Sequence, residues 1–199
     1  MTTIVGVQGP GWAVIGYDSR VVEEGGRSYV LGRGSAKVIK NGPYLLGAAG
    51  DVRAINILAY SFTPPKPAAD LSGVRLDRFM TSKFVPALRE CFEDLGYAPR
   101  ETREQAHHGS IVLATIHGQI YEIGDDYAWV RDTTGIYSCG SGAPYALGAM
   151  YASAGENLAD SGVTETQRVI RDALSVASRL DVGTGPPFHV VTQSAPRGS

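Results

Sequence analysis

The order of strand-like and helix-like segments restricts this 199-residue chain more than any other feature. Alternating β-branched segments come first, and residues 3–7 and 12–17 flank the turn Gly9-Pro10-Gly11 as a predicted hairpin. Two helical segments, a second group of strands, two more helical segments and a last strand follow. This order predicts an α+β fold, a four-layer αββα sandwich of two antiparallel sheets flanked by helices, because a doubly wound sheet would alternate strands with helices.

The first helical segments follow a second predicted strand pair. These strands are expected at residues 37–39 and 44–46. Helical periodicity begins after Asp51 and returns in a longer amphipathic segment, residues 76–95. Pro86 lies inside that segment and predicts a kink or a break, because proline lacks the N–H that a helix interior needs. Gly96 is expected at the C-terminal end of the helix.

The second half repeats the change from strands to helices. Its strands are expected at residues 110–116, 119–123, 127–130, 136–139 and 188–192. Pro144 suits the first turn of one helix. Thr164 and Gln167 match a capping box for a second helix, whose inward face would extend to Leu180. The last residues, 194–199, are polar and small and predict a loose tail.

Composition excludes several classes of function. Hydrophobic residues make up 43% of the chain, which is enough for a core, and the net charge of −2 gives no basic surplus for binding nucleic acid. No apolar run approaches the roughly 18 residues of a membrane span. The first residues lack a secretory signal, and Cys91 and Cys139 have neither a disulfide pattern nor zinc-site spacing. We therefore expect a cytoplasmic protein without cofactor or metal.

Several short motifs together resemble the family of proteasome β subunits and the bacterial peptidase HslV. These motifs, in chain order, are Thr2-Thr3-Ile4-Val5-Gly6, Asp18-Ser19-Arg20, Lys37-Val38, Leu46-Gly47-Ala48-Ala49-Gly50-Asp51, Gly140-Ser141-Gly142-Ala143-Pro144-Tyr145 and Asp181-Val182-Gly183-Thr184-Gly185. Each is weak alone, but the ordered set covers most of the chain. The resemblance implies one N-terminal-nucleophile (Ntn) hydrolase domain over residues 1–199, assembled as stacked rings.

Thr2 is the candidate nucleophile that this resemblance implies. A threonine hydroxyl needs a base to take its proton, and a free N-terminal amine can be that base because its pKa lies near 7.7–8.0. The small Thr2 side chain after Met1 makes removal of the methionine plausible. By itself Thr2 is more simply read as a β-branched residue at the start of a strand, and only the other motifs reverse that reading.

The remaining candidate residues also take their roles from the resemblance. Lys37 would lie beside the Thr2 hydroxyl and Asp18 would hold Lys37, while Arg20 would brace Asp18 or a nearby loop. Gly47 would present its N–H to the oxyanion. The residues expected to orient the Thr2 amine are Ser141, Asp181 and Thr184. Without the resemblance these are ordinary surface ion pairs and turn residues.

Specificity and partners are expectations of the same kind. Val21, Leu45 and Ala49 are candidates for a neutral pocket, which favours cleavage after hydrophobic residues. The predicted substrates are peptides or unfolded proteins, because a ring would exclude folded ones, and an unfolding ATPase or another gating partner is implied. The segment 21–36 is longer than in the family, and Thr184 stands where serine is more common.

Other functions remain open at this level. The same fold can serve as a catalytically silent ring or scaffold protein, and the same nucleophile can cleave small non-peptide amides. The four histidines, His107, His108, His117 and His189, lack the carboxylate pattern of a metal site. The presence of Thr2, Asp18, Lys37 and Gly47 together favours a threonine-type endopeptidase.

Overall fold

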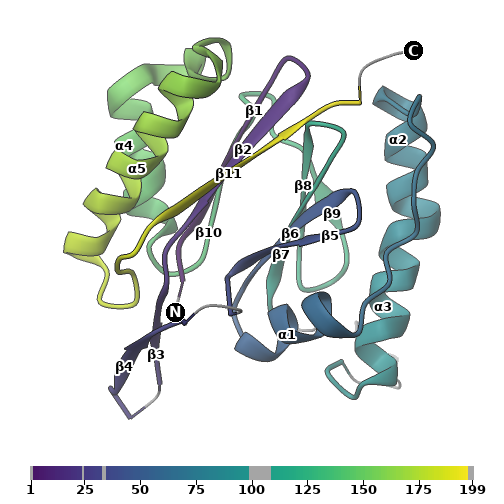
Figure 1. The fold of residues 1–199 in the computed structure, drawn as a ribbon, viewed down its shortest axis with the longest axis horizontal. Helices are drawn as coiled ribbons and strands as arrows, with labels where there is room; N and C mark the ends of the chain where they lie inside the picture. Colours follow the sequence, from purple (N-terminus) through teal and green to yellow (C-terminus); the bar gives the residue numbers. More distant parts are fainter. Residues whose placement is uncertain (1, 24, 33–34, 99–108, 197–199) are drawn as a thin grey trace.

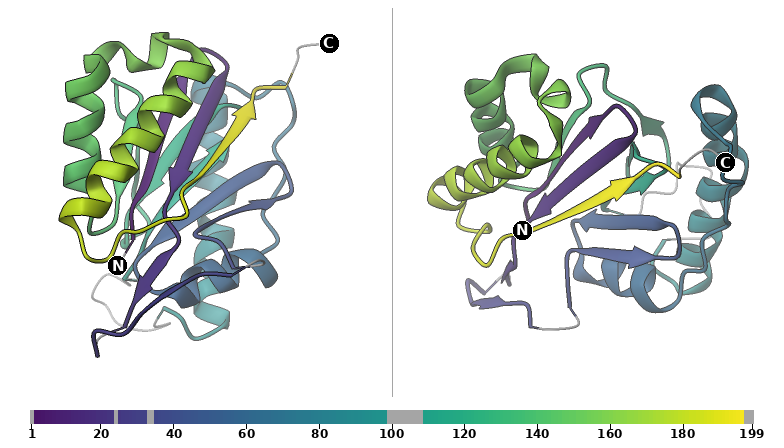
Figure 2. Two further views of the ribbon diagram at one scale, coloured as in Figure 1. Left: turned by 60° about the vertical axis from the view of Figure 1, so that its left-hand side comes forward. Right: turned by 45° about the horizontal axis from the view of Figure 1, so that its top comes forward.

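The computed structural model describes residues 2–23, 25–32, 35–98 and 109–196, and these form four layers. Helices α4 and α5 cover one sheet, a second sheet packs against the first, and α1, α2 and α3 cover its outer side (Figure 1). Figure 2 shows the same arrangement from two further directions. The predicted αββα sandwich is therefore confirmed. None of the described helices is long and apolar enough to cross a membrane.

The first sheet places the start of the chain in its interior. Its order is β10-β1-β2-β11, with β1 Ile4–Gly9, β2 Trp12–Tyr17, β10 Ile136–Cys139 and β11 His189–Ser194. Ile4 pairs with Cys139 on one side and with Tyr17 on the other. The predicted tail begins too early: Ser194 pairs with Trp12 in the sheet, and Ala195 N donates to Gly11 O at 2.8 Å.

The second sheet is an antiparallel meander in the order β5-β6-β7-β8-β9. Its strands are β5 Val38–Asn41, β6 Tyr44–Ala49, β7 Ile111–Ile116, β8 Gln119–Ile123 and β9 Trp129–Val130. His117 and Gly118 form the turn between β7 and β8, and both residues have positive φ (52° and 71°). β9 is shorter than the predicted strand 127–130, because Tyr127 has a φ of 65° and belongs to a turn closed by Gly124.

A small hairpin that sequence patterns missed extends from the body near the N-terminus (Figure 1). It consists of β3 Arg20–Val22 and β4 Ser28–Val30, with Val21 paired to Tyr29. The hairpin accounts for most of the segment 21–36 that is longer than in the resembled family. Its strands are too short for periodicity to reveal.

The outer helices of the second sheet include a wide turn before a proline. These helices are α1 Val52–Tyr60, α2 Gly73–Phe79 and α3 Val85–Asp94, with a π-helical turn Met80–Phe84 between the last two. Pro86 does not break the helix, because residues 73–94 are helical without interruption. The wide turn ends just before Pro86 and relieves the clash of its ring with the preceding turn. Gly96 ends α3 as predicted, with a φ of 63° and its N–H donated to Glu93 O.

The helices on the first sheet correct two expectations. They are α4 Ala143–Ala154 and α5 Gly162–Leu180, joined by a 3₁₀ segment Gly155–Asp160. The capping box at Thr164 and Gln167 is wrong, because α5 already begins at Gly162 and Gln167 Nε2 donates to Thr192 Oγ1 instead. Leu180 does not face inward: it is 59% exposed at the last turn of the helix.

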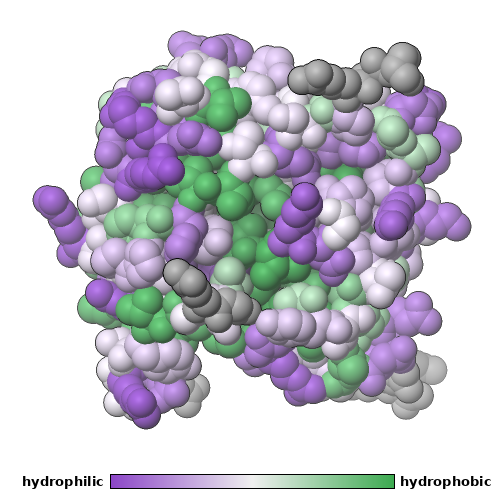
Figure 3. All heavy atoms as spheres, in the orientation of Figure 1, coloured by the Kyte–Doolittle hydropathy of each residue, from purple (hydrophilic) through white to green (hydrophobic). Residues whose placement is uncertain are grey.

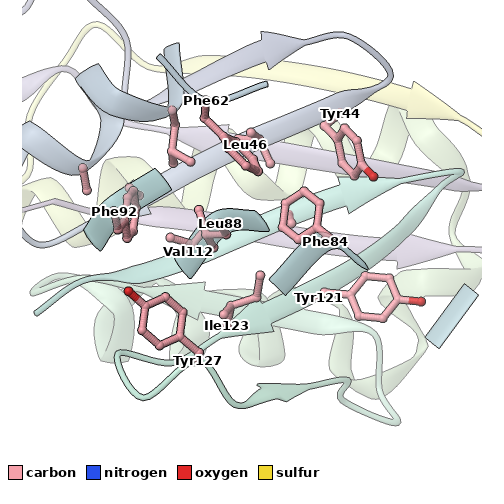
Figure 4. Packing of buried hydrophobic residues seen from close by; sticks show 14 of the residues in the cluster. Tyr44, Leu46, Phe62, Phe84, Leu88, Phe92, Val112, Tyr121, Ile123 and Tyr127 are labelled. Carbon is pink, nitrogen blue, oxygen red and sulfur yellow. The ribbon is translucent and has the colours of Figure 1, made fainter. Parts of the chain in front are cut away.

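Three apolar clusters hold the layers together. One lies between α1–α3 and the second sheet, and Figure 4 shows its aromatic and aliphatic side chains. Another lies between α4, α5 and the first sheet, and a third lies between the two sheets. On the face drawn in Figure 3, hydrophobic residues also gather at the centre. Because both sheets are packed on both sides, their strand ends are fixed, and the candidate residues lie at one such end.

Candidate active site

Thr2 lies at the N-terminal end of β1, against the turn that follows β10. Its exposed fraction is 6%, and Gly142 N lies 3.5 Å from Thr2 O. Gly140 has a φ of 97°, and a Cβ there would lie 2.0 Å from Thr2 O. Only glycine allows this close approach. The pairing of Ile4 with Cys139 thus carries the Gly140-Ser141-Gly142 turn directly to Thr2.

A chain of hydrogen bonds leads from the Thr2 nitrogen to a carboxylate. Thr2 N donates to Ser141 Oγ at 3.3 Å, and Ser141 Oγ donates to Asp181 Oδ2 at 2.9 Å. Thr184 Oγ1 donates to the same oxygen at 2.6 Å. The structure therefore brings together Ser141, Asp181 and Thr184 as the sequence predicts, and it connects the first of them to the Thr2 nitrogen.

Thr3 belongs to this cluster, although sequence reasoning missed it. Thr3 Oγ1 and Thr184 Oγ1 are 2.5 Å apart, and because the Thr184 proton goes to Asp181, the Thr3 hydroxyl is the donor. A Cβ on Gly142 would lie 2.1 Å from Thr3 Oγ1 and 2.6 Å from Thr184 Oγ1. Thr184 is therefore linked to β1 through the Thr3 hydroxyl. The signal was present as the repeated threonine in the first motif.

Asp18 and Lys37 form a buried ion pair beside this cluster. Lys37 Nζ lies 2.6 Å from Asp18 Oδ1, and the two residues are 4% and 0% exposed. Asp18 also accepts from the backbone N–H groups of Thr3, Arg20 and Gly185 at 2.9–3.0 Å. Lys37 donates a second bond to Arg20 O at 2.5 Å. The hydrogen bonds and the ion pair together offset the free-energy cost of burying both charges.

Burial lowers the pKa of Lys37 below its ordinary value, although Asp18 and Asp181 oppose the shift. Removal from water disfavours the ammonium form, and the nearby carboxylates restore part of it. Lys37 and Thr2 line the same small cavity, of about 20 Å³. The Lys37 ammonium, whose pKa is lowered, therefore lies close to the candidate nucleophile Thr2.

Arg20 braces the loop that carries Asp181 and Thr184. Its guanidinium donates to Val182 O at 3.3 Å, and a Cβ on Gly185 would lie 2.3 Å from Arg20 Nε. The sequence left open whether Arg20 braces Asp18 or a nearby loop, and its side chain contacts the loop. Its backbone N–H donates a hydrogen bond to Asp18 Oδ2.

Gly47 does not lie at this site. It is inside β6, paired with Val38 and Leu113, and a Cβ there would lie 3.2 Å from Ile4 Cδ1 between the sheets. Ala48 N donates to Lys37 O, so the alternation of a strand turns the Gly47 N–H toward β7. The prediction of Gly47 as oxyanion donor is therefore wrong.

Gly50 takes the position that was expected for Gly47. It follows the end of β6 with a φ of 136°, and it lines both cavities that contain Thr2. A Cβ there would lie 2.5 Å from Ser110 Oγ. The motif contains two glycines three residues apart, and because the strand continues through Ala49, only the second glycine has backbone groups that leave the sheet.

Two cavities meet at Thr2. The smaller one is walled by Val21, Leu31, Val52 and Ile55, and the larger one, of about 460 Å³, includes Ala49. Val21 and Ala49 thus lie beside Thr2 as predicted, although in different cavities. Leu45 does not: it pairs with Lys40 and lines a separate cavity near His117 and Thr192. Since side chains alternate along β6, and Leu45 is four residues before Ala49, it shares that face but lies toward the other end of the strand.

Among the described residues, neither the cysteines nor the histidines line the two cavities at Thr2. Cys139 is buried in β10, and burial raises the pKa of its thiol, as expected for a structural residue. His117 Nδ1 contacts Leu71 O, and His189 stacks on Tyr17. His107 and His108 lie outside the described residues. No group of three or more metal-ligating side chains occurs within the described ranges.

Comparison with known proteins adds the likeness of the whole fold. No protein-family model and no curated protein sequence matches the chain. Among solved structures, BPH of Thiobacillus denitrificans is 22% identical over 99% of this chain and 100% of its own, with a TM-score of 0.74. The same protein in complex with epoxomicin gives 20% identity, coverage of 98% and 100%, and a TM-score of 0.70.

A second protein has the same architecture. HslV of Trypanosoma brucei is 20% identical over 97% of this chain and 99% of its own, with a TM-score of 0.60. This chain has the proteasome-like fold of BPH and HslV. At these identities the likeness concerns the fold, and it extends over the full described architecture. The αββα arrangement expected from the sequence motifs is thus the arrangement that the neighbours share.

Proposed function

We propose that this chain is a threonine-type endopeptidase of a proteasome-like ring, with Thr2 as nucleophile after removal of Met1. One observation carries the proposal: the Thr2 nitrogen is hydrogen-bonded to the Ser141–Asp181 pair, beside the buried Asp18–Lys37 ion pair. A structural copy of the fold has no need for this set at the end of β1. The neighbouring BPH structure with epoxomicin bound supports a ligand site in this fold.

The first half of the reaction uses Thr2 twice. The neutral α-amine takes the proton of the Thr2 hydroxyl, and Oγ attacks the carbonyl carbon of the scissile bond. The Ser141 oxygen accepts one amine N–H, which leaves the nitrogen lone pair for the hydroxyl proton. The backbone N–H of Gly50 would stabilise the oxyanion, since this residue lines both cavities at Thr2.

The second half releases both products. The C–N bond breaks, the leaving amine takes the proton from the Thr2 ammonium, and an ester remains on Oγ. Water then attacks this ester with the Thr2 amine again as base, which restores the free hydroxyl and gives the carboxylate product. Lys37 contributes positive charge near Oγ, and Asp18 compensates that charge and holds the ammonium in place.

The acyl side of the substrate would use the smaller cavity, which Lys37 and Asp51 also line. Its walls of Val21, Leu31 and Ile55 favour neutral residues before the scissile bond, short ones first because the cavity holds about 20 Å³. A peptide library cleaved only after acidic residues would contradict this assignment. We expect peptides or unfolded proteins as substrates, and stacked rings with an unfolding ATPase or another gating partner.

Peptide hydrolysis by Thr2→Ala and Thr2→Ser variants tests the proposal. The alanine variant should lose at least about a thousandfold in kcat/KM, and the serine variant should retain part of the activity. Thr81→Ala, at an exposed helical position, serves as control. An inactive wild type that forms rings would instead indicate the silent scaffold, and hydrolysis of small amides without peptides would indicate an amidase.

A further inference from the structure

The turn at Gly50 follows the last residue of β6, Ala49. Ala48 N donates to Lys37 O, and the alternation of the strand directs the Gly50 N–H to the same side. Gly50 also lines the smaller cavity together with Thr2 and Lys37. Beyond this N–H the chain leaves the sheet, with a φ of 136° at Gly50. The direction of the proposed oxyanion donor therefore depends on what holds the turn after the strand.

Ser110 holds this turn from the neighbouring strand. It lies directly before β7, it is 2% exposed, and its Oγ accepts the Asp51 N–H at 3.2 Å. A Cβ on Gly50 would lie 2.5 Å from the same Oγ, so the glycine packs against the serine hydroxyl with no room for a side chain. Asp51 is in turn the N-cap of α1, where its side chain accepts from Arg53 N at 2.8 Å. The helix thus holds the far end of the turn, and Ser110 holds its middle.

Tyr97 fixes the Ser110 side chain from the outer helical layer. Its hydroxyl lies 2.7 Å from Ser110 Oγ, and its ring packs edge-on against Phe92 of α3, with the ring centroids 4.9 Å apart. Burial raises the pKa of Tyr97, so the phenol keeps its proton over the neutral range and stays a hydrogen-bonding partner of the serine. With the phenol on one side and the Asp51 N–H on the other, the serine oxygen is hydrogen-bonded as buried hydroxyl groups generally are.

We infer that Ser110 and Tyr97 are positioning residues of the proposed reaction, because they hold the Gly50–Asp51 turn so that the Gly50 N–H meets the oxyanion. The inference rests on the proposed function and adds two residues that no sequence motif marked. An oxyanion donor acts through its geometry: the charge develops during the reaction, and a displaced donor loses most of its effect. Neither side chain needs to contact the substrate for this role.

Ser110 also lines the larger cavity, so direct contact with the substrate is the alternative role. The two roles predict different kinetics. A contact that is equally strong in the ground state and the transition state raises KM when it is lost and leaves kcat unchanged. Loss of oxyanion positioning lowers kcat and leaves KM unchanged, because the oxyanion exists only as the reaction proceeds.

The test measures peptide hydrolysis by the full-length Ser110→Ala and Tyr97→Phe variants, and their inhibition by a peptide aldehyde. In the aldehyde adduct Thr2 Oγ bonds to the aldehyde carbon and the hydroxyl proton passes to the aldehyde oxygen, which then lies where the oxyanion would. We expect kcat to fall about tenfold to a hundredfold in Ser110→Ala and about threefold to tenfold in Tyr97→Phe, with KM nearly unchanged. The inhibition constant of the aldehyde should rise by the factor by which kcat/KM falls, since the adduct resembles the transition state.

Tyr44→Phe and Ser178→Ala are the matched controls. Each removes a hydroxyl that donates to a backbone carbonyl, at 2.7 Å for Tyr44 and 2.8 Å for Ser178. Neither residue lines the cavities at Thr2. Both controls should therefore keep kcat and the aldehyde inhibition constant within about twofold of the wild type.

Three results would overturn the inference. The first is an unchanged kcat in both variants, and the second is a rise in KM alone, which would make Ser110 a binding residue. The third is a fall in kcat without a matching loss of aldehyde affinity, which would indicate a general disturbance of the fold. Tyr97→Phe removes a single oxygen and decides the question if Ser110→Ala does not fold. Failure of the proposed function would look different, because the wild type itself would then neither cleave peptides nor bind the aldehyde.

Discussion

Two networks meet at Thr2, and they differ in burial. The Asp18–Lys37 pair is inside the protein, and three backbone N–H groups complete the shell of the carboxylate. The Ser141–Asp181 pair is carried by two loops, and Ser141 is exposed. The Asp18–Lys37 network holds two buried charges in place. The Ser141–Asp181 network can form or break a hydrogen bond without repacking of the core. Proton transfer is expected at the second network and stability at the first.

Removal of Asp18 should have the largest effect on stability. Asp18→Ala leaves a buried ammonium and the donors of Thr3 and Gly185 without their acceptor, so we expect a loss of about 3–5 kcal/mol in the free energy of unfolding. Lys37→Met should cost less, because the three N–H donors still hold Asp18. Denaturant unfolding measures both, with Asp172→Ala on the exposed face of α5 as control. Equal losses of unfolding free energy in Asp18→Ala and Lys37→Met would contradict the larger structural role that we assign to Asp18.

A glycine substitution tests whether the second network depends on a close approach. In Gly140→Ala the new Cβ would meet Thr2 O at 2.0 Å, so the turn must move away and take Ser141 with it. We expect kcat/KM to fall by about a hundredfold. Gly148→Ala is the control, because a Cβ there meets open space. Wild-type activity in Gly140→Ala would show that Ser141 need not stay near Thr2.

The proton network should affect catalysis more than folding. Ser141→Ala and Asp181→Asn should each lower kcat/KM by about 10–100-fold while changing the free energy of unfolding by less than about 1 kcal/mol. The double variant should lose little more than either single one, because the two residues act as one chain. Ser178→Ala, on α5, controls for loss of a hydroxyl. Additive losses in the double variant would argue against the chain.

The smallest effect concerns pH. The folded-state pKa of Lys37 lies below its ordinary value of 10.5, so the unfolded chain binds a proton that the folded chain does not between these two pKa values. The wild type should therefore gain stability relative to Lys37→Met as pH rises toward 10.5, and lose that gain as pH falls through the folded pKa. Urea unfolding of both proteins over the alkaline range measures the difference. A constant difference would mean an unshifted lysine.

The sequence predicted the layers better than the details of the site. Hydrophobic periodicity and turn residues give the αββα order, since each element has to bury one face. Ser141, Asp181 and Asp18 were found because they lie in short motifs. Thr3 also lies in a motif, but it was missed because the motif does not show that its hydroxyl contacts Thr184. Gly47 and Leu45 were misplaced because a motif does not say where a strand ends.

The intact mass of untagged protein, before and after incubation with epoxomicin, tests the central claim most directly. The account predicts loss of Met1 and one covalent adduct per chain, absent from Thr2→Ala. These masses would place a free Thr2 amine and a reactive hydroxyl on the same residue. Complete retention of Met1 in cell-derived protein, with no adduct, would contradict the account, because the Thr2 nitrogen would remain an amide and could not serve as the base.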